Sequence, residues 1–131
     1  MGPNQLAKSN ILVEANRLLS TQGVALHHID LSDHFSHGDR KIPAINFLQF
    51  SDAEWRKYAG NRLAYTNRLR VNEYQEIYRD CSQRILQIQS EVDGRSINVL
   101  KEGFALDPRF QGLAPETVCT RTVRILSRPI R

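Results

Sequence analysis

Residues 23–31 read Gly-Val-Ala-Leu-His-His-Ile-Asp-Leu, and the fold class can be argued outward from this stretch. It is too short for a stable helix, and its apolar side chains fall on both odd and even positions. This composition is typical of a strand inside a parallel sheet, whose two faces are both covered. We therefore expect a central strand at 24–31, with His27 and His28 on opposite faces.

Upstream of this strand, residues 6–19 have the spacing of a helix. Their apolar positions follow an i, i+4, i+7, i+8 pattern that predicts one buried stripe, formed by Ile11, Ala15, Leu18 and Leu19. Gly23 provides the break after the last turn. A helix followed by a central strand is half of an α/β unit. Because no strand precedes this helix, we expect the chain to begin inside a larger fold.

Downstream, the residues from Ser51 predict a short helix. Ser51 and Glu54 have the spacing of a capping box, and Phe50 and Trp55 that of a hydrophobic staple. The helix is expected to end near Ala59.

The second half of the chain predicts one more helix and two strands. The helix is expected at 72–83, a strand at 84–92 with Ile85 on the face opposite Leu86 and Ile88, and a turn at Asp93-Gly94. An irregular crossover leads to the last strand at 118–127, which Pro129 stops.

Charge and composition favour an ordinary globular domain. The 131 residues carry a net charge of +4, and residues 1–66 contribute seven basic and six acidic side chains against eleven and eight in 67–131. This mild, dispersed excess argues against a nucleic-acid partner. No apolar run is long enough to span a bilayer, and residues 1–5 lack the charged and apolar regions of a signal peptide. We therefore expect no membrane association and a cytoplasmic location.

The two cysteines, Cys81 and Cys119, lie far apart and outside any Cys-x-x-Cys motif. Buried free thiols are the expected state.

Several segments resemble the C-terminal half of bacterial class I methyltransferases that use S-adenosylmethionine. Residues 23–35 resemble the fifth strand and following loop of that family, and the stretch from Asn46 to Trp55 resembles its insertion. Asn67-Arg68-Leu69-Arg70 followed by Tyr74 is similar to the entry into its next helix, and residues 113–116 to the turn before its last strand.

The resemblance implies a single domain over 1–131, with a helical insertion at about 32–83. It implies the last three strands of a Rossmann-like methyltransferase sheet of mixed parallel and antiparallel pairing, in which the last strand runs antiparallel between the other two. The chain would then be the acceptor-side portion of such an enzyme, inactive in isolation; the alternative is a non-enzymatic dimerisation or binding module derived from that fold.

The cofactor-binding half of the family is missing. Class I methyltransferases hold S-adenosylmethionine on a glycine-rich turn, and no two of the seven glycines here are separated by a single residue. We expect no S-adenosylmethionine binding by this chain alone. The open edge of strand 24–31 then predicts a homo-oligomer or docking of the missing half.

Seven polar residues within thirteen positions form the candidate acceptor site: His27, His28, Asp30, Asp33, His34, His37 and Asp39. Open α/β sheets bind ligands at the carboxyl end of a central strand. The resemblance makes His28 and His34 candidate bases and Asp30 and Asp33 acceptor-binding residues. Hydrogen bonds that fix the loop are the alternative. A metal site is not expected, because His27 and His28 diverge.

Four further residues could bind an unknown small-molecule acceptor. Arg68 and Arg70 could clamp an anionic group, but a salt bridge with Glu73 or Asp80 at the entry to the helix is the preferred explanation. Trp55 and Tyr65 could line a pocket, although aromatic side chains more often pack in a core.

Overall fold

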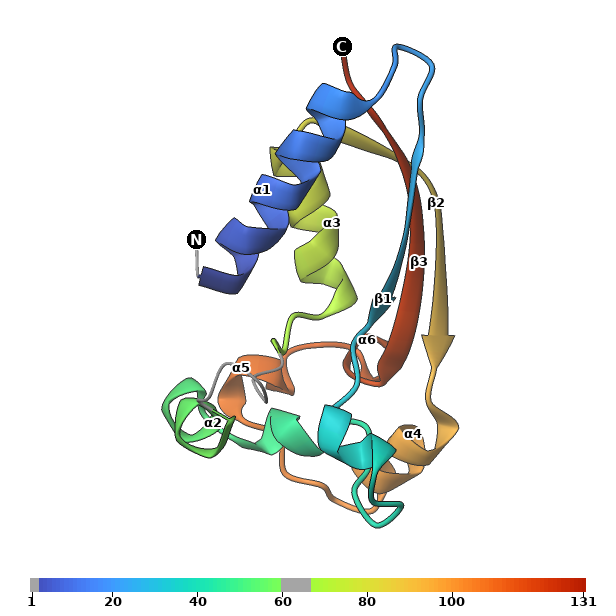
Figure 1. Cartoon of the computed structure of the whole chain (residues 1–131). Coiled ribbons are helices and arrows are strands. Elements are labelled where there is room, and N and C mark those ends of the chain that lie inside the picture. Colours follow the sequence, from blue (N-terminus) through green and yellow to red (C-terminus); the bar gives the residue numbers. More distant parts are fainter. Residues whose placement is uncertain (1–2, 60–66) are drawn as a thin grey trace.

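The computed structural model describes residues 3–59 and 67–131, with the side chains of residues 3–7 left out of the description. Its centre is a three-stranded sheet of β1 (Ala25–Asp30), β2 (Gln83–Val92) and β3 (Thr120–Pro129), in the order β1-β3-β2. Strand β3 pairs antiparallel with both neighbours. The expected position of the last strand, antiparallel between the other two, is confirmed (Figure 1).

The expected mixture of parallel and antiparallel pairs is not found among the described residues. Strands β1 and β2 run in the same direction, but β3 separates them, so each hydrogen-bonded pair is antiparallel. The chain therefore forms a mixed α/β fold around an antiparallel sheet.

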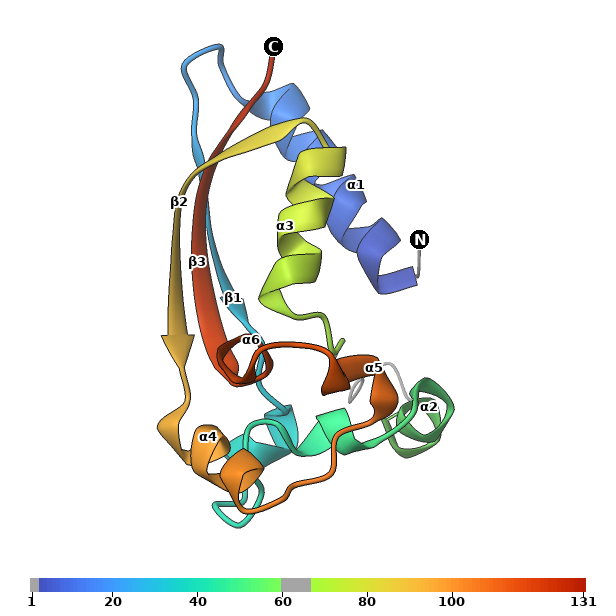
Figure 2. The same cartoon turned by 180° about the vertical axis from the view of Figure 1, so that it is seen from behind.

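Helices α1 (Pro3–Leu18) and α3 (Val71–Asp80) lie side by side on the same face of the sheet (Figures 1 and 2). Tyr74, Ile77 and Tyr78 of α3 are buried with Val123 and Ile125 of β3. This first core explains the helical periodicity predicted from residue 72, because the apolar face of α3 is the face that meets the sheet. The helix ends at Asp80, however, before the predicted end at 83, and Gln83 already belongs to β2.

The buried stripe predicted for α1 is wrong. Ile11 and Leu18 are 57% and 69% exposed, whereas Leu12 is 4% exposed. The helix is turned so that Ser9, Leu12 and Asn16 face α3, where Asn16 donates a hydrogen bond of 2.8 Å to the carbonyl of Cys81.

A second core lies beyond the end of the sheet, where the shorter helices gather. These elements are the 3-10 turns η1 (His34–His37) and η2 (Asn46–Gln49), and the helices α2 (Asp52–Ala59), α4 (Gly94–Lys101), α5 (Pro108–Gln111) and α6 (Pro115–Val118). Phe47, Trp55 and Phe110 are buried at its centre. Cys119 belongs to this core and Cys81 to the first one, and both are buried free thiols, as expected.

The crossover between β2 and β3 was predicted to be irregular but contains three helices. Asp93, predicted as a turn residue, caps α4 by accepting hydrogen bonds from the backbone and the hydroxyl of Ser96. Pro108 and Pro115 open α5 and α6 at their first turns, where proline is favoured. Strand β3 also continues to Pro129, which pairs with Gln83.

Two predictions about side-chain direction in the strands are also corrected. A register shift in β2 leaves Leu86 without a partner in β3, so Ile85 and Ile88 both pack on the first core while Leu86 is 44% exposed. Strand β1 was expected to be covered on both faces, yet burial alternates along it and Leu26 is 67% exposed. Helices cover only one face of the sheet in the described chain.

None of the helices in the described part of the chain is long and apolar enough to cross a membrane.

Candidate functional site

The candidate site begins where β1 ends, and Asp33 fixes the loop there. Asp33 is 1% exposed, and its carboxylate accepts a hydrogen bond of 2.9 Å from the backbone N–H of Phe35, which caps η1. Its own N–H donates to the carbonyl of Ala44. Burial raises the pKa of Asp33. These contacts correspond to the loop-fixing alternative for Asp33.

Asp30, Ser32 and His37 form a polar cluster next to this loop. The Ser32 hydroxyl donates to Asp30 Oδ1 at 2.6 Å, and the Ser32 N–H donates to the same oxygen at 2.9 Å. His37 Nε2 lies 2.9 Å from Ser32 Oγ and 3.4 Å from Asp30 Oδ2. The sequence thus folds back over five residues to place an imidazole beside a carboxylate.

The hydrogen bonds assign the proton on His37. A serine hydroxyl has one proton, and that of Ser32 goes to Asp30. The contact between His37 and Ser32 therefore needs the proton on Nε2 of His37. In the neutral imidazole, Nδ1 is then the free acceptor. A base held in one tautomer by a carboxylate is suited to remove a proton from a bound molecule.

Asp30 stays ionised in this cluster. Burial works against its charge, but the two hydrogen bonds from Ser32 and the nearby His37 and His34 outweigh burial and hold the pKa of Asp30 below its ordinary value. His34 Nε2 lies 3.8 Å from Asp30 Oδ2, and the His34 and His37 rings are 5.1 Å apart. Of the two predicted bases, His34 therefore belongs to this cluster.

His28, the other predicted base, is exposed on β1 and lines a cavity that Asp30 and His34 of the cluster also line, whereas His37 does not. This cavity of about 390 Å³ runs along the edge of β1, because residues of both faces of the strand, His27 to Asp30, line it together with α1 and α3. Inside it, His27 Nδ1 lies 2.8 Å from the hydroxyl of Tyr78. The structure thus separates His28 from His37, and confirms that His27 and His28 diverge.

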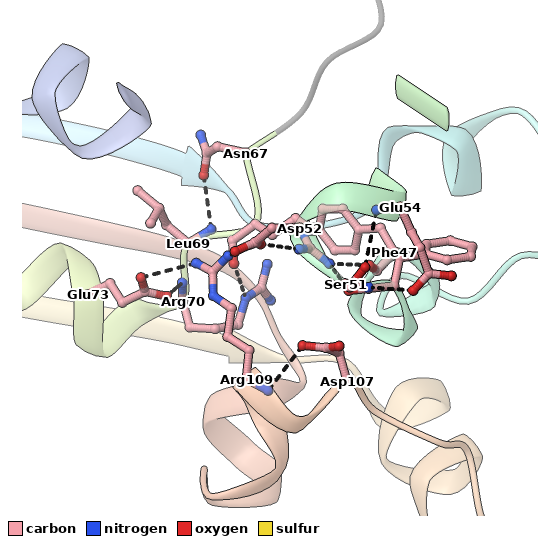
Figure 3. A network of polar contacts seen from close by, with 12 residues as sticks. Phe47, Ser51, Asp52, Glu54, Asn67, Leu69, Arg70, Glu73, Asp107 and Arg109 are labelled. Carbon is pink, nitrogen blue, oxygen red and sulfur yellow. Dashed lines mark hydrogen bonds and ion pairs between the residues drawn. The ribbon is translucent and has the colours of Figure 1, made fainter. Parts of the chain in front are cut away.

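Arg68 and Arg70 stand at the entry to α3 but point into the protein. Arg68 donates hydrogen bonds to the carbonyls of Phe47 and Phe50 and pairs with Asp52 at 2.5 Å. Asp52 also pairs with Arg109 at 2.8 Å (Figure 3). The partner of Arg68 is therefore Asp52, rather than either of the two acids proposed from the sequence.

Arg70 is 1% exposed and joins the two cores. Its guanidinium donates to the carbonyls of Leu31, Val118 and Arg68, and lies 5.5 Å from the ring of Phe47. Figure 3 shows Arg70 beside Glu73. Burial lowers the pKa of Arg70 to about 10. Both guanidinium groups are thus engaged by the chain itself, which favours a structural role; their predicted role in acceptor binding stays a prediction.

The two predicted aromatic residues differ in what can be said of them. Trp55 is 3% exposed in the second core. Its ring stacks on that of Phe50 with 6.1 Å between the ring centroids, which confirms the hydrophobic staple predicted for these two residues. Tyr65 lies outside the described residues. Within the described ranges, no group of three or more His, Cys, Asp or Glu side chains is arranged to hold a metal ion.

Sequence reasoning missed the roles of Ser32 and His37. From the sequence, His37 is one of the seven polar residues but not a candidate base, and Ser32 belongs only to the loop after the strand. The available signal was the Asp-x-Ser spacing at the end of a strand, which favours a side-chain turn that brings the next residues back. No spacing rule could have shown that His37 returns to Asp30.

Comparisons of the chain with models of protein families, with curated proteins and with solved structures found no match.

Proposed function

We propose that this chain is the acceptor-side part of a methyltransferase-like fold that uses S-adenosylmethionine and needs a second polypeptide segment to complete its sheet. The three strands would then be the end of a larger Rossmann-like sheet, and the missing segment would add a parallel strand beside β1. The site at the end of β1 would receive the methyl acceptor.

The order and direction of the strands are the observation that carries this proposal. The family that the sequence resembles ends its sheet with three neighbouring strands, of which the last is antiparallel between the other two, and β1-β3-β2 has that order. Helices α1 and α3, which precede and follow β1 in the chain as in α/β units, lie on one face. The free edge of β1 is where the next strand belongs.

The residues of this chain do not fit the cofactor. Only Gly103 among the described glycines has a positive φ, of 97°, and it lies on a turn after α4 rather than after a strand. The sequence has no Gly-x-Gly turn. We therefore assign cofactor binding to the absent segment, and to this chain only the groups that meet the acceptor.

Those groups are the Asp30, Ser32 and His37 cluster, with His34 beside it. Class I methyltransferases act chiefly by aligning the acceptor, and a base removes the acceptor's proton where one is lost. His37 has the better geometry for that base, because its Nε2 proton is fixed and its Nδ1 is free. His28 and His34, preferred from the sequence, remain candidates for contacts with the acceptor.

Reconstitution tests this proposal. The cofactor-binding half of a class I methyltransferase of known structure is produced alone and mixed with this chain, and S-adenosylmethionine binding is measured by calorimetry. That enzyme's own C-terminal half is the positive control. We expect cofactor binding by the mixture but not by the chain alone, and loss of it with Leu26→Lys, which places a charge beside the edge where the halves would meet.

Two results would contradict the proposal. Saturable binding of micromolar S-adenosylmethionine by the isolated chain would place a cofactor site within these residues. Failure of the mixture, with a working positive control, would remove the assignment of β1 to the fifth position of that sheet.

A non-enzymatic dimerisation module is the second candidate, and the exposed apolar surface favours it. Val24, Leu26 and Leu86 are 46%, 67% and 44% exposed on or beside the sheet. A second copy that covers this surface would also occupy the free edge of β1. The oligomeric state in solution, treated at the end of the Discussion, tests this candidate.

A further inference from the structure

A second cavity, of about 260 Å³, opens at the end of the sheet where β1 and β2 finish. Three segments that are far apart in the sequence line it: the loop after β1, the start of α4, and the start of β3. Its lining consists of Ser32, Ser36, His37, Ile42, Ala44, Asp93, Arg95 and Arg121. The His37 ring therefore belongs both to the polar cluster described above and to this cavity.

A bulge in β3 brings Arg121 to the cavity. Glu91 pairs with Thr122 and the next residue of β2, Val92, pairs with Thr120, so Arg121 has no partner in β2. A bulge of this kind re-aims one side chain out of the regular alternation of a strand, and bulges are frequent beside functional sites. The carbonyl of Arg121 still accepts a hydrogen bond from Leu31, which holds the bulge against the end of β1.

The two arginines of the cavity lack the partners that the other site arginines have. Arg68 and Arg109 form ion pairs, and Arg70 donates to carbonyls, whereas for Arg95 and Arg121 no side-chain hydrogen bond or ion pair is found among the described residues. Both are exposed at the cavity.

Asp93, the one acid among the lining residues, has one of its carboxylate oxygens engaged. Asp93 Oδ2 accepts hydrogen bonds of 3.2 and 2.6 Å from the backbone and the hydroxyl of Ser96, at the start of α4. The serine protons are engaged too, because Ser32 donates to Asp30 and Ser36 donates to the carbonyl of Asp33. The free donors of the cavity are therefore guanidinium N–H groups.

We propose that this cavity binds a small organic oxyanion, a carboxylate or a phosphate monoester, between Arg95 and Arg121. Guanidinium groups present planar pairs of donors that match carboxylate and phosphate oxygens. The cavity is at the small end of ligand sites, and Ile42 and Ala44 give it an apolar wall, so it suits an oxyanion on a short carbon chain. The inference concerns binding by this chain alone and does not rest on the proposed function.

Titration with inorganic phosphate and with propionate tests the site, followed by backbone and arginine side-chain NMR signals, with sodium chloride at equal ionic strength as the reference. We expect saturable shifts at Ala44, Arg95 and Arg121 with at least one oxyanion and not with chloride. Arg95→Gln and Arg121→Gln should each weaken binding about tenfold or more, the usual cost of a lost charge-assisted hydrogen bond.

Arg124→Gln is the matched control, since Arg124 is exposed on the same strand but does not line the cavity. Its binding should be unchanged. Arg121→Lys keeps the charge and should bind the oxyanion more tightly than Arg121→Gln. This comparison distinguishes an effect of the lost charge from an effect of a disturbed bulge in β3. The proposal is overturned if neither oxyanion gives saturable shifts at tens of millimolar, or if Arg124→Gln weakens binding as much as the two cavity variants.

Discussion

At the scale of single residues, Arg70 is the side chain on which both cores depend. It is a buried cation whose hydrogen-bond acceptors are the backbone carbonyls of Leu31, Val118 and Arg68, rather than a carboxylate. Leu31 belongs to the first core and Val118 to the second. A buried carbonyl that loses its donor costs about 1–3 kcal/mol, so these hydrogen bonds make Arg70 a link between the two cores.

Replacing Arg70 with alanine is expected to lower the free energy of unfolding by about 3–5 kcal/mol, because three carbonyls lose their donor and a cavity opens. Arg70→Met should lose less, since it refills the space and removes a buried charge. Urea unfolding followed by circular dichroism measures both. The exposed Arg79→Ala is the control and should change stability by less than about 0.5 kcal/mol. A loss in Arg70→Ala no larger than that of the control would disprove the bridging role.

The lowered pKa of His27 predicts how the stability of the protein depends on pH. Burial, and then the charge of Lys8, lower the pKa of His27 below its ordinary value of about 6.5. The folded protein therefore binds fewer protons than the unfolded chain between the two pKa values of His27. Neutral His27 makes its full contribution to the free energy of unfolding above about pH 6.5, and this contribution is lost as pH falls through the folded pKa.

We expect His27→Gln to flatten the pH dependence of the unfolding free energy between about pH 7 and pH 5, because glutamine does not titrate and can still form a hydrogen bond with Tyr78. The exposed Ser20→Ala, which changes no titratable group, should keep the wild-type slope. Equal slopes for wild type and His27→Gln would show that His27 is not the group that titrates.

At the scale of elements, α2 is the one whose start the sequence predicted in atomic detail. The backbone of Ser51 donates to Glu54 Oε1 at 3.0 Å, and the backbone of Glu54 donates to Ser51 Oγ at 3.1 Å. The capping box is therefore confirmed. It lies next to Asp52, which pairs with Arg68, so the cap also fixes the acid that faces the buried arginine.

Ser51→Ala is expected to cost about 1 kcal/mol of stability, the usual value for a lost N-cap hydroxyl. Thermal unfolding followed by circular dichroism measures it. The exposed Ser20→Ala, in the loop after α1, is the matched control and should leave the melting temperature unchanged. A Ser51→Ala variant as stable as Ser20→Ala would mean that water replaces the cap without cost.

The elements that the sequence predicted are those fixed by local contacts. Strand β1, helix α3 and the cap of α2 follow from side chains within a few residues of each other. The prediction failed where distant contacts decide: α1 is rotated because Leu12 and Asn16, not Ile11 and Leu18, meet α3. In the same way, Ser32 and His37 meet Asp30 only after the loop folds back, and Arg121 reaches its cavity through a bulge that no periodicity indicates.

At the scale of the whole molecule, the sheet is covered on one side only in the described chain. Helices α1 and α3 pack on one face of the sheet (Figure 2). Leu26 and Leu86 are exposed, and β1 is an edge strand of the described sheet. The cavity along β1 adds the exposed Ile11 of α1 to this surface. A strand edge beside exposed apolar side chains favours pairing with another chain.

We therefore expect the isolated chain to be a homodimer or larger, joined through β1 and the surface around it. Each backbone hydrogen bond formed at the edge contributes about 0.5–1.5 kcal/mol. Each Å² of apolar area removed from water adds about 25 cal/mol. Light scattering at tens of micromolar protein should then give at least twice the 15.0 kDa of one chain. Nothing in the strand opposes the pairing, because 24–31 contains neither lysine nor proline.

Leu26→Lys should convert the assembly to monomers, since each copy would bring a charge into the apolar contact while the fold, which leaves Leu26 67% exposed, should tolerate lysine. Tyr58→Lys is the matched control: Tyr58 is 62% exposed on α2, away from β1, and its loss should leave the mass unchanged. A monomeric mass for the wild-type chain would rule out self-association through this edge. An assembly that Leu26→Lys leaves intact would place the contact on another surface.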